Sequence, residues 1–375
     1  MAERFDVLIV GGGIAGASVG AELASHCSVA IVERENRAGY HATGRSAALF
    51  SELYGNPAIR ALSRASRAFL FDPPTGFCET ALVFRRGALY VAREDQVATF
   101  EAMVASPGVS AGARLIDGSE ARRLSPLLRP GYAAMGIFEP DARDIDVDAL
   151  HQGYLRHFRA KGGCILLNAD LRGLEAKAGA WRADTSVGNI AARIVVNAAG
   201  AWAEQIGTMA GAAPIGLTPR RRTAVLVDAP GGPEIAASPA TIDVDEQFYF
   251  KPDAGLVLLS PADETPSAAC DAQPDELDIA TAVDRIQTAT TLEVRRLRSK
   301  WAGLRSFVDD RTPVVGFDER QAGFFWLAGQ GGYGIQTAPA MGRLAAALLR
   351  GEEIPAELLE LGVDRAAIGP GRLTR

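Results

Sequence analysis

The first third of the chain alternates between short apolar runs and segments with helical periodicity. An apolar run at residues 5–10 precedes a small-residue helical stretch at 14–25, and a second apolar run follows at 28–33. After a polar loop, helical periodicity resumes at 56–72. The apolar stripe of this helix is formed by Ile59, Leu62, Ala65 and Phe69. The pattern predicts a strand, a helix and a strand, followed by a further helix.

Two later blocks, residues 81–144 and 217–304, consist of short strand candidates separated by charged turns. The second block contains a hairpin turn at 252–255 and a helix near 275–291. The opening pattern returns between and after them. It predicts a helix at 146–161 with Val147, Leu150, Tyr154 and Phe158 inward, strands at 164–168 and 192–200, and a strand, glycine turn and helix in the last block, from 324. We therefore predict two discontinuous domains, one of residues 1–80, 145–216 and 305–375, the other of residues 81–144 and 217–304.

Composition narrows the class of protein. A chain of 375 residues with 48% hydrophobic residues can bury two cores, and a net charge of −6 without a long basic run argues against nucleic-acid binding. The four cysteines, which form no C-x-x-C pair, predict neither a metal site nor disulfides. We find no signal peptide and no apolar stretch of about 18 residues that could span a membrane. We expect a cytoplasmic protein, with peripheral membrane association as an open alternative and a dispensable tail after about residue 352.

Four glycines occupy six positions between the first predicted strand and helix. In this G-x-G-x-x-G arrangement Gly11 makes the tight turn, Gly13 lets the backbone approach a pyrophosphate and Gly16 lets the helix pack on the strand. The helix N-terminus adds free N–H groups and a partial positive charge. Glu33, about 20 residues downstream, can accept hydrogen bonds from ribose hydroxyls. We predict a dinucleotide site, and a glycine turn that serves only packing is the alternative.

Spacing alone does not choose between NAD and FAD. Four segments carry a resemblance: HATGRSAA (41–48), VVNAAGAWA (195–203), WAGLRSF (301–307) and AGQGGYGIQTAPAMG (328–342). Together they resemble the D-amino-acid oxidase superfamily of flavoproteins over almost the whole chain, with bacterial D-arginine dehydrogenases as the most similar type. The resemblance implies an α/β (α+β, two-domain) fold, in which a Rossmann-like FAD-binding domain is interleaved with a substrate domain built on a mixed β-sheet.

The resemblance also implies which residues would contact FAD. The glycine turn before the last helix would present N–H groups to the flavin ring, whose reduced form is an anion. The predicted contacts are Gly11, Gly13, Ile14, Ala15, Gly16, Glu33, Arg34, His41, Gly44, Arg45, Ser46, Ala47, Ala198, Ala199, Gly200, Trp202, Gly331, Gly332, Tyr333, Gly334, Ile335 and Gln336. We expect non-covalent FAD. Relatives that oxidise N-methylated glycines attach the flavin to the histidine of a similar H-A-x-G segment, so a covalent bond to His41 is the alternative.

Oxidation of an amino acid by hydride transfer requires a clamp for the carboxylate, a neutral amine and a Cα–H aimed at the flavin. Arg222 and Arg305 match the family pattern for this clamp, and a planar guanidinium suits a carboxylate. Strand alternation places Arg220 and Arg222 on one face. The alternative is an ordinary solvated arginine at a strand end.

The resemblance supplies further candidates around the clamp. Tyr54 and Tyr249 would line the pocket, with simple packing as the alternative, and the carbonyl of Gly332 would meet the substrate amine. No histidine is needed as a base. We expect the remaining histidines on helix surfaces: His26, His151 and His157.

Two positions depart from the arginine-preferring relatives. Ala88 aligns with their acidic residue and Leu49 with a histidine, so a guanidinium bound there would be desolvated without a charge partner. We therefore expect D-Arg and D-Lys to be poor substrates and uncharged, apolar D-amino acids to be preferred. Glu52 would restore a negative charge if it turned inward.

The main functional prediction is FAD-dependent oxidative deamination of D-amino acids to imino acids and then 2-oxo acids. The alternative within the superfamily is a secondary-amine or glycine-type oxidase or dehydrogenase that acts on sarcosine, D-proline or hydroxyproline. A more distant alternative is a non-catalytic flavin-binding subunit of a complex. The sequence leaves the electron acceptor open among a quinone, a protein carrier and O2, and it indicates neither a metal, a nucleic-acid partner nor an integral membrane segment.

Overall fold

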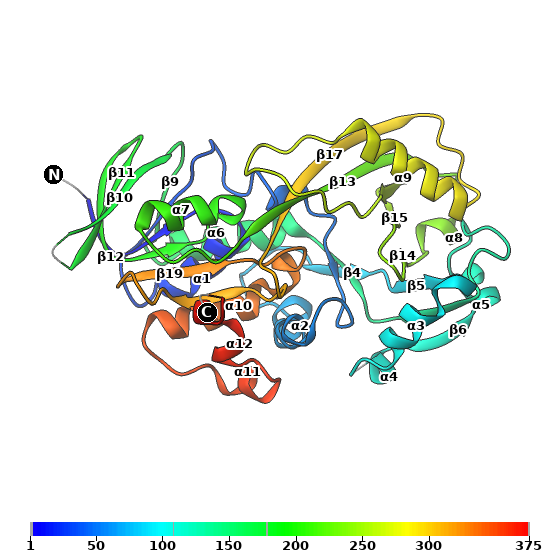
Figure 1. Ribbon diagram of the computed structural model, residues 1–375, viewed down its shortest axis with the longest axis horizontal. Coiled ribbons are helices and arrows are strands. Elements are labelled where there is room, and N and C mark those ends of the chain that lie inside the picture. Colours follow the sequence, from blue (N-terminus) through cyan, green and yellow to red (C-terminus); the bar gives the residue numbers. More distant parts are fainter. Residues whose placement is uncertain (1–2, 108, 178, 374–375) are drawn as a thin grey trace.

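The computed structural model describes residues 3–107, 109–177 and 179–373, which form two lobes side by side (Figure 1). The strands are β1 (Glu3–Val10), β2 (Val29–Val32), β3 (Leu49–Phe50), β4 (Val83–Arg85), β5 (Ala88–Ala92), β6 (Arg114–Asp117), β7 (Met135–Glu139), β8 (Arg143–Ile145), β9 (Cys164–Leu166), β10 (Leu171–Lys177), β11 (Ala180–Thr185), β12 (Gly188–Asn197), β13 (Thr218–Asp228), β14 (Ala240–Asp243), β15 (Tyr249–Asp253), β16 (Leu256–Ser260), β17 (Leu297–Phe307), β18 (Val314–Phe317) and β19 (Phe324–Ala328). The α-helices are α1 (Ile14–Leu23), α2 (Pro57–Phe71), α3 (Val97–Val104), α4 (Val109–Gly112), α5 (Gly118–Leu124), α6 (Val147–Ala160), α7 (Ala203–Ala210), α8 (Pro233–Ala236), α9 (Glu276–Ala289), α10 (Gly334–Leu349), α11 (Ala356–Glu360) and α12 (Arg365–Ile368).

The first lobe is built on an eight-stranded mixed sheet. Its path runs β10-β11-β12-β1-β2-β9, and β19 pairs with β12 while β18 pairs with β19. The pairs β12–β1, β1–β2, β2–β9 and β12–β19 are parallel. A parallel sheet needs crossover connections, and the α1 crossover between β1 and β2 places the helix N-terminus at the carboxyl end of β1. The predicted Rossmann-like opening is confirmed.

Helices cover both faces of this sheet, which explains why β2 and β19 are apolar and buried throughout. On one face α1, α2, α6 and α10 share a core with the sheet. On the other face α7 packs over Trp326 and Phe324 of β19. Local sequence starts the helices where expected: Asn56 caps α2 by accepting the N–H of Ile59, and Pro57 follows at the first helical position.

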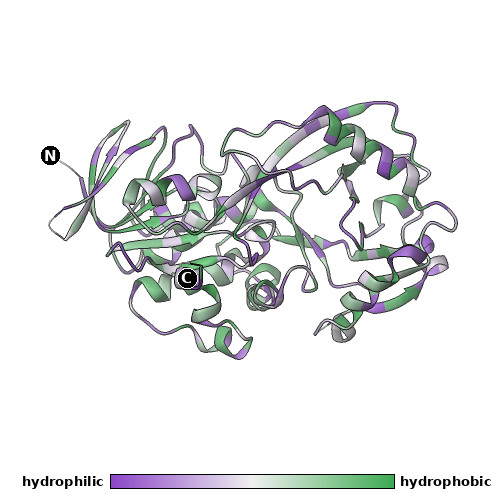
Figure 2. Cartoon of the chain, in the orientation of Figure 1, coloured by the Kyte–Doolittle hydropathy of each residue, from purple (hydrophilic) through white to green (hydrophobic). Residues whose placement is uncertain are grey.

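The second lobe is an eight-stranded mixed sheet in the order β17-β13-β16-β15-β14-β5-β7-β6. Its pairs are antiparallel except for β14–β5. The helix α9 packs on one face, and in Figure 2 it alternates between green and purple segments, as a helix with one buried side should. The opposite face looks toward the first lobe, and a small sheet of β3, β8 and β4 adjoins it.

Two expectations about chain boundaries need revision. Strand β17 continues pairing with β13 as far as Phe307, beyond the expected domain boundary between residues 304 and 305, so we propose a boundary after β17. The tail after residue 352 is not a loose appendage. Leu358, Val363 and Ile368 are buried in the core of the first lobe, because α11 and α12 each turn one apolar residue or more inward.

Candidate functional site

Three adjoining cavities form one trough between the two lobes. Their volumes are about 320, 150 and 100 Å³, and we call them the first, middle and inner cavities. The first and middle cavities share Gly13, Arg45 and Gly200 in their walls, and the middle and inner cavities share Arg305 and Gly332. The trough therefore runs from the glycine turn at α1 to the substrate-facing side of the second sheet.

The first cavity has the features of a nucleotide site. The carboxylate of Glu33 is buried and accepts the N–H groups of Gly12 and Glu35 at 2.8 and 2.9 Å, which fixes its direction at the cavity wall. The guanidinium of Arg34 stacks 5.1 Å from the ring of Trp202. A ribose hydroxyl could donate to the remaining lone pairs of Glu33, as the sequence predicts.

The glycines of the motif have different reasons to be there. A Cβ on Gly11, whose φ is +107°, would lie 2.5 Å from the carbonyl oxygen of Ala198, and one on Gly16 would lie 2.0 Å from that of Gly11. Both are therefore required by backbone packing whatever is bound. A Cβ on Gly13 would lie 3.2 Å from the Thr43 hydroxyl oxygen and near no other described atom outside its chain neighbours, so space for a ligand is the better reason.

The N-termini of α1 and α10 both face the middle cavity. Residues Ile14, Ala15 and Gly334 lie in its wall, and neither helix has a side-chain N-cap. Uncapped helix starts offer N–H groups and positive potential to phosphates and to an anionic ring. The residues present therefore fit a dinucleotide whose phosphates lie at α1 and whose other end lies at α10.

Tight packing sets the glycine turn before α10. Gly331 has a φ of +54°, and a Cβ there would lie 2.1 Å from the Phe307 ring. A Cβ on Gly332 would lie 3.0 Å from a terminal guanidinium nitrogen of Arg305. The turn can thus approach Phe307 and Arg305 closely only because Gly331 and Gly332 have no side chains.

Most of the predicted FAD contacts line the trough. Those in its walls are Gly11, Gly13, Ile14, Ala15, Glu33, Arg34, His41, Arg45, Ser46, Ala47, Ala198, Ala199, Gly200, Trp202, Gly331, Gly332, Gly334, Ile335 and Gln336. Three predicted contacts lie elsewhere. Gly16 lies within α1, Gly44 lines a fourth cavity beside α6 that shares Thr43 and Arg45 with the first, and Tyr333 packs against Tyr54 and Phe307.

His41 and Arg45 have protein partners. The His41 ring lies 2.9 Å from a carboxylate oxygen of Glu35 and lines the first cavity, at the Glu33 end of the trough. Arg45 donates to the carbonyls of Ala272 and Ala302, so its guanidinium ties the 3-10 turn Thr43–Arg45 to the second lobe. The position of His41 is consistent with non-covalent binding.

Arg305 is the strongest candidate in the inner cavity. It lines the cavity wall, and its guanidinium makes no hydrogen bond or ion pair with any residue that the structure describes. Burial by itself would lower the pKa of Arg305, but the neighbouring Tyr54 and Tyr249 contribute to an overall increase, so the guanidinium stays charged. A charged, unpartnered guanidinium at a cavity wall suits a carboxylate ligand.

Arg222 lies beside it with partners already in place. Its Nε donates to the carbonyl of Asp263 at 2.8 Å, and a terminal nitrogen lies 3.3 Å from a carboxylate oxygen of Glu264. It is nearly buried and lines both the middle and inner cavities. Strand alternation holds as expected, since Arg221 instead pairs with Asp278 of α9.

Tyr54 and Tyr249 line the inner cavity, and neither hydroxyl has a hydrogen-bond partner in the described part of the chain. Burial raises the pKa of Tyr54, so its phenol stays protonated and can donate to a ligand. Gly332 also lies in this wall. The residues assigned from the resemblance therefore come together around one cavity.

The other end of the inner cavity differs from expectation. Leu49 lines it, but Ala88 does not; Ala88 is buried, and Tyr90, two residues along β5, lies in the wall instead. Glu52 does not turn inward, because it pairs with Arg67 at 3.0 Å. Sequence reasoning missed Lys251, which lines the cavity, although alternation along β15 places it on the face of Tyr249.

A buried carboxyl, Glu139, links the lobes behind the inner cavity. It accepts the hydroxyl of Ser51 at 2.6 Å and the N–H of Glu52 at 2.8 Å. The N–H of Ser51 donates to Gln336 of α10, which lines the cavity. Burial raises the pKa of Glu139 to about 7. The network therefore couples a titratable group to the position of α10.

The expectation for His151 is wrong. His151 is buried, and its ring donates to the carbonyl of Gly12 at 2.9 Å, so it supports the glycine turn from behind. Burial lowers the pKa of His151 and favours the neutral ring. The spacing from Val147 (i+4) and to Tyr154 (i+3) puts it on the inward stripe of α6, a signal that the sequence offered. His26 is exposed in the turn after α1, and His157 is half-buried beside Phe77.

Other chemistries find no support in the described part of the chain. No three side chains among its His, Cys, Asp and Glu residues are grouped so that they could hold a metal ion. Among residues 3–107, 109–177 and 179–373, no helix has both the length and the apolar character needed to cross a membrane.

Comparison with known proteins gives consistent matches. Residues 6–348 match the family described as "DAO: FAD dependent oxidoreductase". A glycine oxidase of Geobacillus kaustophilus (strain HTA426) is 24% identical over 377 residues, covering 97% of this chain and 98% of that protein. The crystal structure of a glycine oxidase from Geobacillus kaustophilus superposes with a TM-score of 0.81 at 23% identity, over 97% of this chain and 99% of that one. That of L-proline dehydrogenase from P. horikoshii gives 0.84 at 22% identity, over 99% and 98%.

These matches support the superfamily and not the finer resemblance to D-arginine dehydrogenases. They also agree with the trough, whose uncapped helix starts, Glu33 and glycine turns fit the cofactor named in the family description. Bound FAD would be held by the first and middle cavities and would supply the electron acceptor for oxidation of an amine. The chain belongs to the DAO family of FAD-dependent oxidoreductases.

Proposed function

We propose that this protein oxidises a small α-amino acid with a primary or secondary amine, in the manner of a glycine-type or secondary-amine oxidase or dehydrogenase. The observation that carries the proposal is the unpartnered guanidinium of Arg305 beside Gly332, in a cavity of about 100 Å³. Such a cavity is smaller than most ligand sites and favours a small substrate. The names of the similar glycine oxidase and proline dehydrogenase point in the same direction.

The residues of the inner cavity would bind and orient the substrate. Arg305 would hold the carboxylate, and the hydroxyls of Tyr54 and Tyr249 would donate further hydrogen bonds to it. The carbonyl of Gly332 would accept a hydrogen bond from the amine. With the carboxylate and the amine held in this way, the Cα–H would face the middle cavity.

When bound, FAD would supply a two-electron acceptor, so that loss of the Cα hydrogen as a hydride from the neutral amine would leave the iminium form of an imine. The substrate ammonium must first lose a proton. No histidine is found among the described residues of the inner cavity wall, so water or an acceptor at the cavity mouth would take it. Water then hydrolyses the imine to a 2-oxo acid and ammonia or an amine.

Oxidation of D-amino acids is the second candidate. The inner cavity extends past Tyr249 to Leu49 and Ile242, which leaves room for a side chain on Cα. D-Arg and D-Lys stay disfavoured, now because Lys251 would repel a second cation there and not because of Ala88. A non-catalytic flavin subunit finds less support, since it needs no unpartnered carboxylate clamp.

The test is anaerobic reduction of the purified FAD-loaded protein by glycine, sarcosine, L- and D-proline, D-alanine, D-leucine and D-arginine in separate reactions. Loss of the flavin absorbance with sarcosine, glycine or proline at the highest kcat/KM supports the proposal. A higher kcat/KM for D-leucine than for all of these would favour the D-amino-acid candidate. A flavin that none of them reduces would contradict both.

A further inference from the structure

A second cation lies in the wall of the inner cavity. Lys251 of β15 lines it together with Leu49 and Ile242, and its side chain is only 10% exposed. Its amine lies 2.6 Å from one carboxylate oxygen of Asp144. An ammonium has three donors, and in the described part of the chain Asp144 is the one partner of this amine.

The charge of this ion pair is not balanced. The other oxygen of Asp144 accepts from the Nε of Arg86 at 2.7 Å, so two cations share one carboxylate. All three side chains are less than 20% exposed. Burial of an unbalanced charge is costly unless an anion joins it. The triad of Lys251, Asp144 and Arg86 therefore carries a net positive charge, and Lys251 is its member in the cavity wall.

The register of the second sheet places Lys251 and the carboxylate clamp at opposite ends of the cavity. Lys251 pairs with Leu258, which pairs with Leu226 of β13. Arg305 pairs with Arg220, six residues before Leu226, so its Cα lies about 20 Å along the strand direction and three strand spacings of about 4.8 Å from that of Lys251. Both side chains lie in the cavity wall, and Leu49, Ile242 and Phe248 contribute apolar surface to the same cavity.

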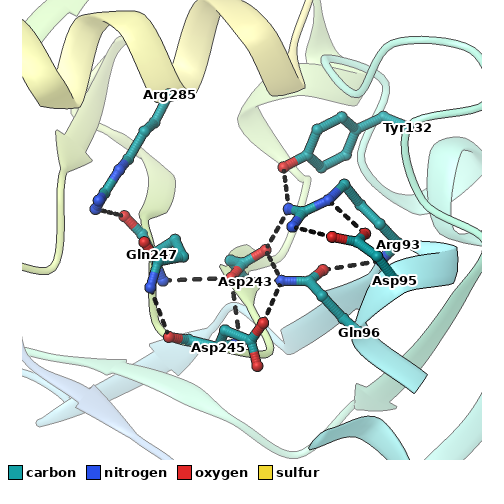
Figure 3. A network of polar contacts seen from close by, with 8 residues as sticks. All are labelled: Arg93, Asp95, Gln96, Tyr132, Asp243, Asp245, Gln247 and Arg285. Carbon is teal, nitrogen blue, oxygen red and sulfur yellow. Dashed lines mark hydrogen bonds and ion pairs between the residues drawn. The ribbon is translucent and has the colours of Figure 1, made fainter. Parts of the chain in front are cut away.

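Other charges near the cavity do not cancel this cation. Glu246 lines the mouth, and it is exposed to water, which screens it. Glu246 lies in the turn between β14 and β15. Buried Asp243, at the end of β14, holds this turn in place by binding Gln96 and Arg93, as Figure 3 shows. Glu139 lies behind Ser51 and Tyr90, and burial raises its pKa to about 7. Among the described residues of the cavity wall, exposed Glu246 is thus the one carboxylate that faces the same space as Lys251.

We propose that Lys251 forms a subsite for a second carboxylate, so that the preferred substrate is a small amino acid with two carboxylates. This inference rests on the proposed function and specifies its substrate class. One carboxylate binds Arg305 and the other binds Lys251, with the amine between them. The second carboxylate lies either on the side chain, as in D-aspartate, or on the amine substituent, as in iminodiacetate.

The experiment compares substrates in pairs on the FAD-loaded protein. Iminodiacetate is paired with sarcosine, and D-aspartate with D-alanine, by kcat/KM for anaerobic flavin reduction. We expect the dicarboxylate of at least one pair to be favoured about tenfold or more. Lys251→Met should lower that ratio about tenfold, whereas Lys300→Met, which removes an exposed lysine of β17 in the same sheet, should leave the ratio unchanged.

A second variant separates recognition from folding. Asp144→Asn keeps Lys251 and removes its neutralising partner, so we expect the ratio to stay or to rise. If Lys251 and Asp144 matter only as a structural ion pair, both variants will lower kcat/KM equally for the two substrates of a pair. That result, or a wild-type protein with no preference for the dicarboxylate in either pair, overturns the inference.

A binding measurement reads the subsite without turnover. Succinate and butyrate have equal carbon number and differ in the second carboxylate, and their binding is followed by perturbation of the flavin spectrum. We expect succinate to bind more tightly, and Lys251→Met to weaken it about tenfold with little effect on butyrate. Should the protein reduce no flavin with any amine, the proposed function fails, while this measurement still decides the Lys251 subsite.

Discussion

At the scale of single residues, Arg305 carries most of the expected substrate binding. Because no described residue pairs with its guanidinium, its replacement breaks no internal ion pair and should remove mainly substrate contacts. We expect Arg305→Met to lower kcat/KM for the best amine substrate about a hundredfold or more, with the larger part in KM. Arg298→Met on the same strand, an exposed arginine paired with Asp228, is the matched control and should change kcat/KM less than twofold. Equal losses in both variants would contradict the clamp assignment.

Glu139 should make stability depend on pH. Burial raises the pKa of its carboxyl from 4.5 to about 7 in the folded protein. Its contribution to stability is therefore complete below pH 4.5 and is lost as the pH rises through 7. In Glu139→Gln, which keeps an acceptor for Ser51, the free energy of unfolding relative to wild type should increase from pH 4.5 to pH 7.5 by up to roughly 3 kcal/mol. Denaturant titrations across this range measure it.

The exposed Glu353→Gln is the control for this series, and its difference from wild type should stay constant with pH. A constant difference for Glu139→Gln as well would show that the buried carboxyl keeps its ordinary titration.

The residues that sequence reasoning found and missed differ in a physical way. Arg222 and Arg305 stand in distinctive segments, so a family resemblance could assign them. Lys251 stands in an ordinary strand, and its importance depends on Asp144, which lies 107 residues away in sequence. Alternation along β15 predicts which face of the sheet carries Lys251. It does not predict that Asp144, which also binds Arg86, lies next to the Lys251 amine. Such charge balances appear only once the lobes are assembled.

At the scale of elements, the C-terminal helices belong to the core of the first lobe. Leu358 is fully buried there, while its neighbour Leu359 in α11 is 52% exposed. Leu358→Ala should therefore lower the free energy of unfolding by about 2–4 kcal/mol through lost burial and a cavity, and Leu359→Ala by less than about 0.5 kcal/mol. Equilibrium unfolding of the two variants provides the comparison, and similar small effects would mean that the tail is dispensable after all.

Periodicity located most helices and buried strands, because an element with one or two buried faces needs apolar residues at the spacing of those faces. It identified α1, α2, α6 and α9 to within a few residues. It did not identify β10 and β11, which pair as a hairpin at the edge of the first sheet. Many residues in these two strands are polar and exposed. An edge strand buries little, so its pattern is weak. We expected a domain boundary between residues 304 and 305, which lies inside β17. The last residues of this strand line the trough, but they still pair with β13 as far as Phe307.

At the scale of the whole molecule, the trough draws its walls from both lobes. Glu33 and Gly13 come from the first lobe, and Gly303 and Arg305 from β17 of the second. FAD bound there would contact both lobes, and the unfolded chain has no such site. The free energy of unfolding should thus rise with free FAD by about 1.4 kcal/mol for each tenfold increase above the dissociation constant.

Thermal unfolding of FAD-depleted protein over a range of added FAD measures this linkage. We expect the transition of both lobes to move together, because a ligand that bridges them couples their unfolding. ADP, which would fill only the Glu33 end, lacks the part that reaches α10 and β17, so we expect it to bind more weakly and to stabilise less than FAD does at the same free concentration. If ADP stabilised the protein as much as FAD, or if FAD moved only one of two transitions, the flavin end of the trough would not join the lobes, and the placement of the inner cavity beside the flavin would lose its main physical support.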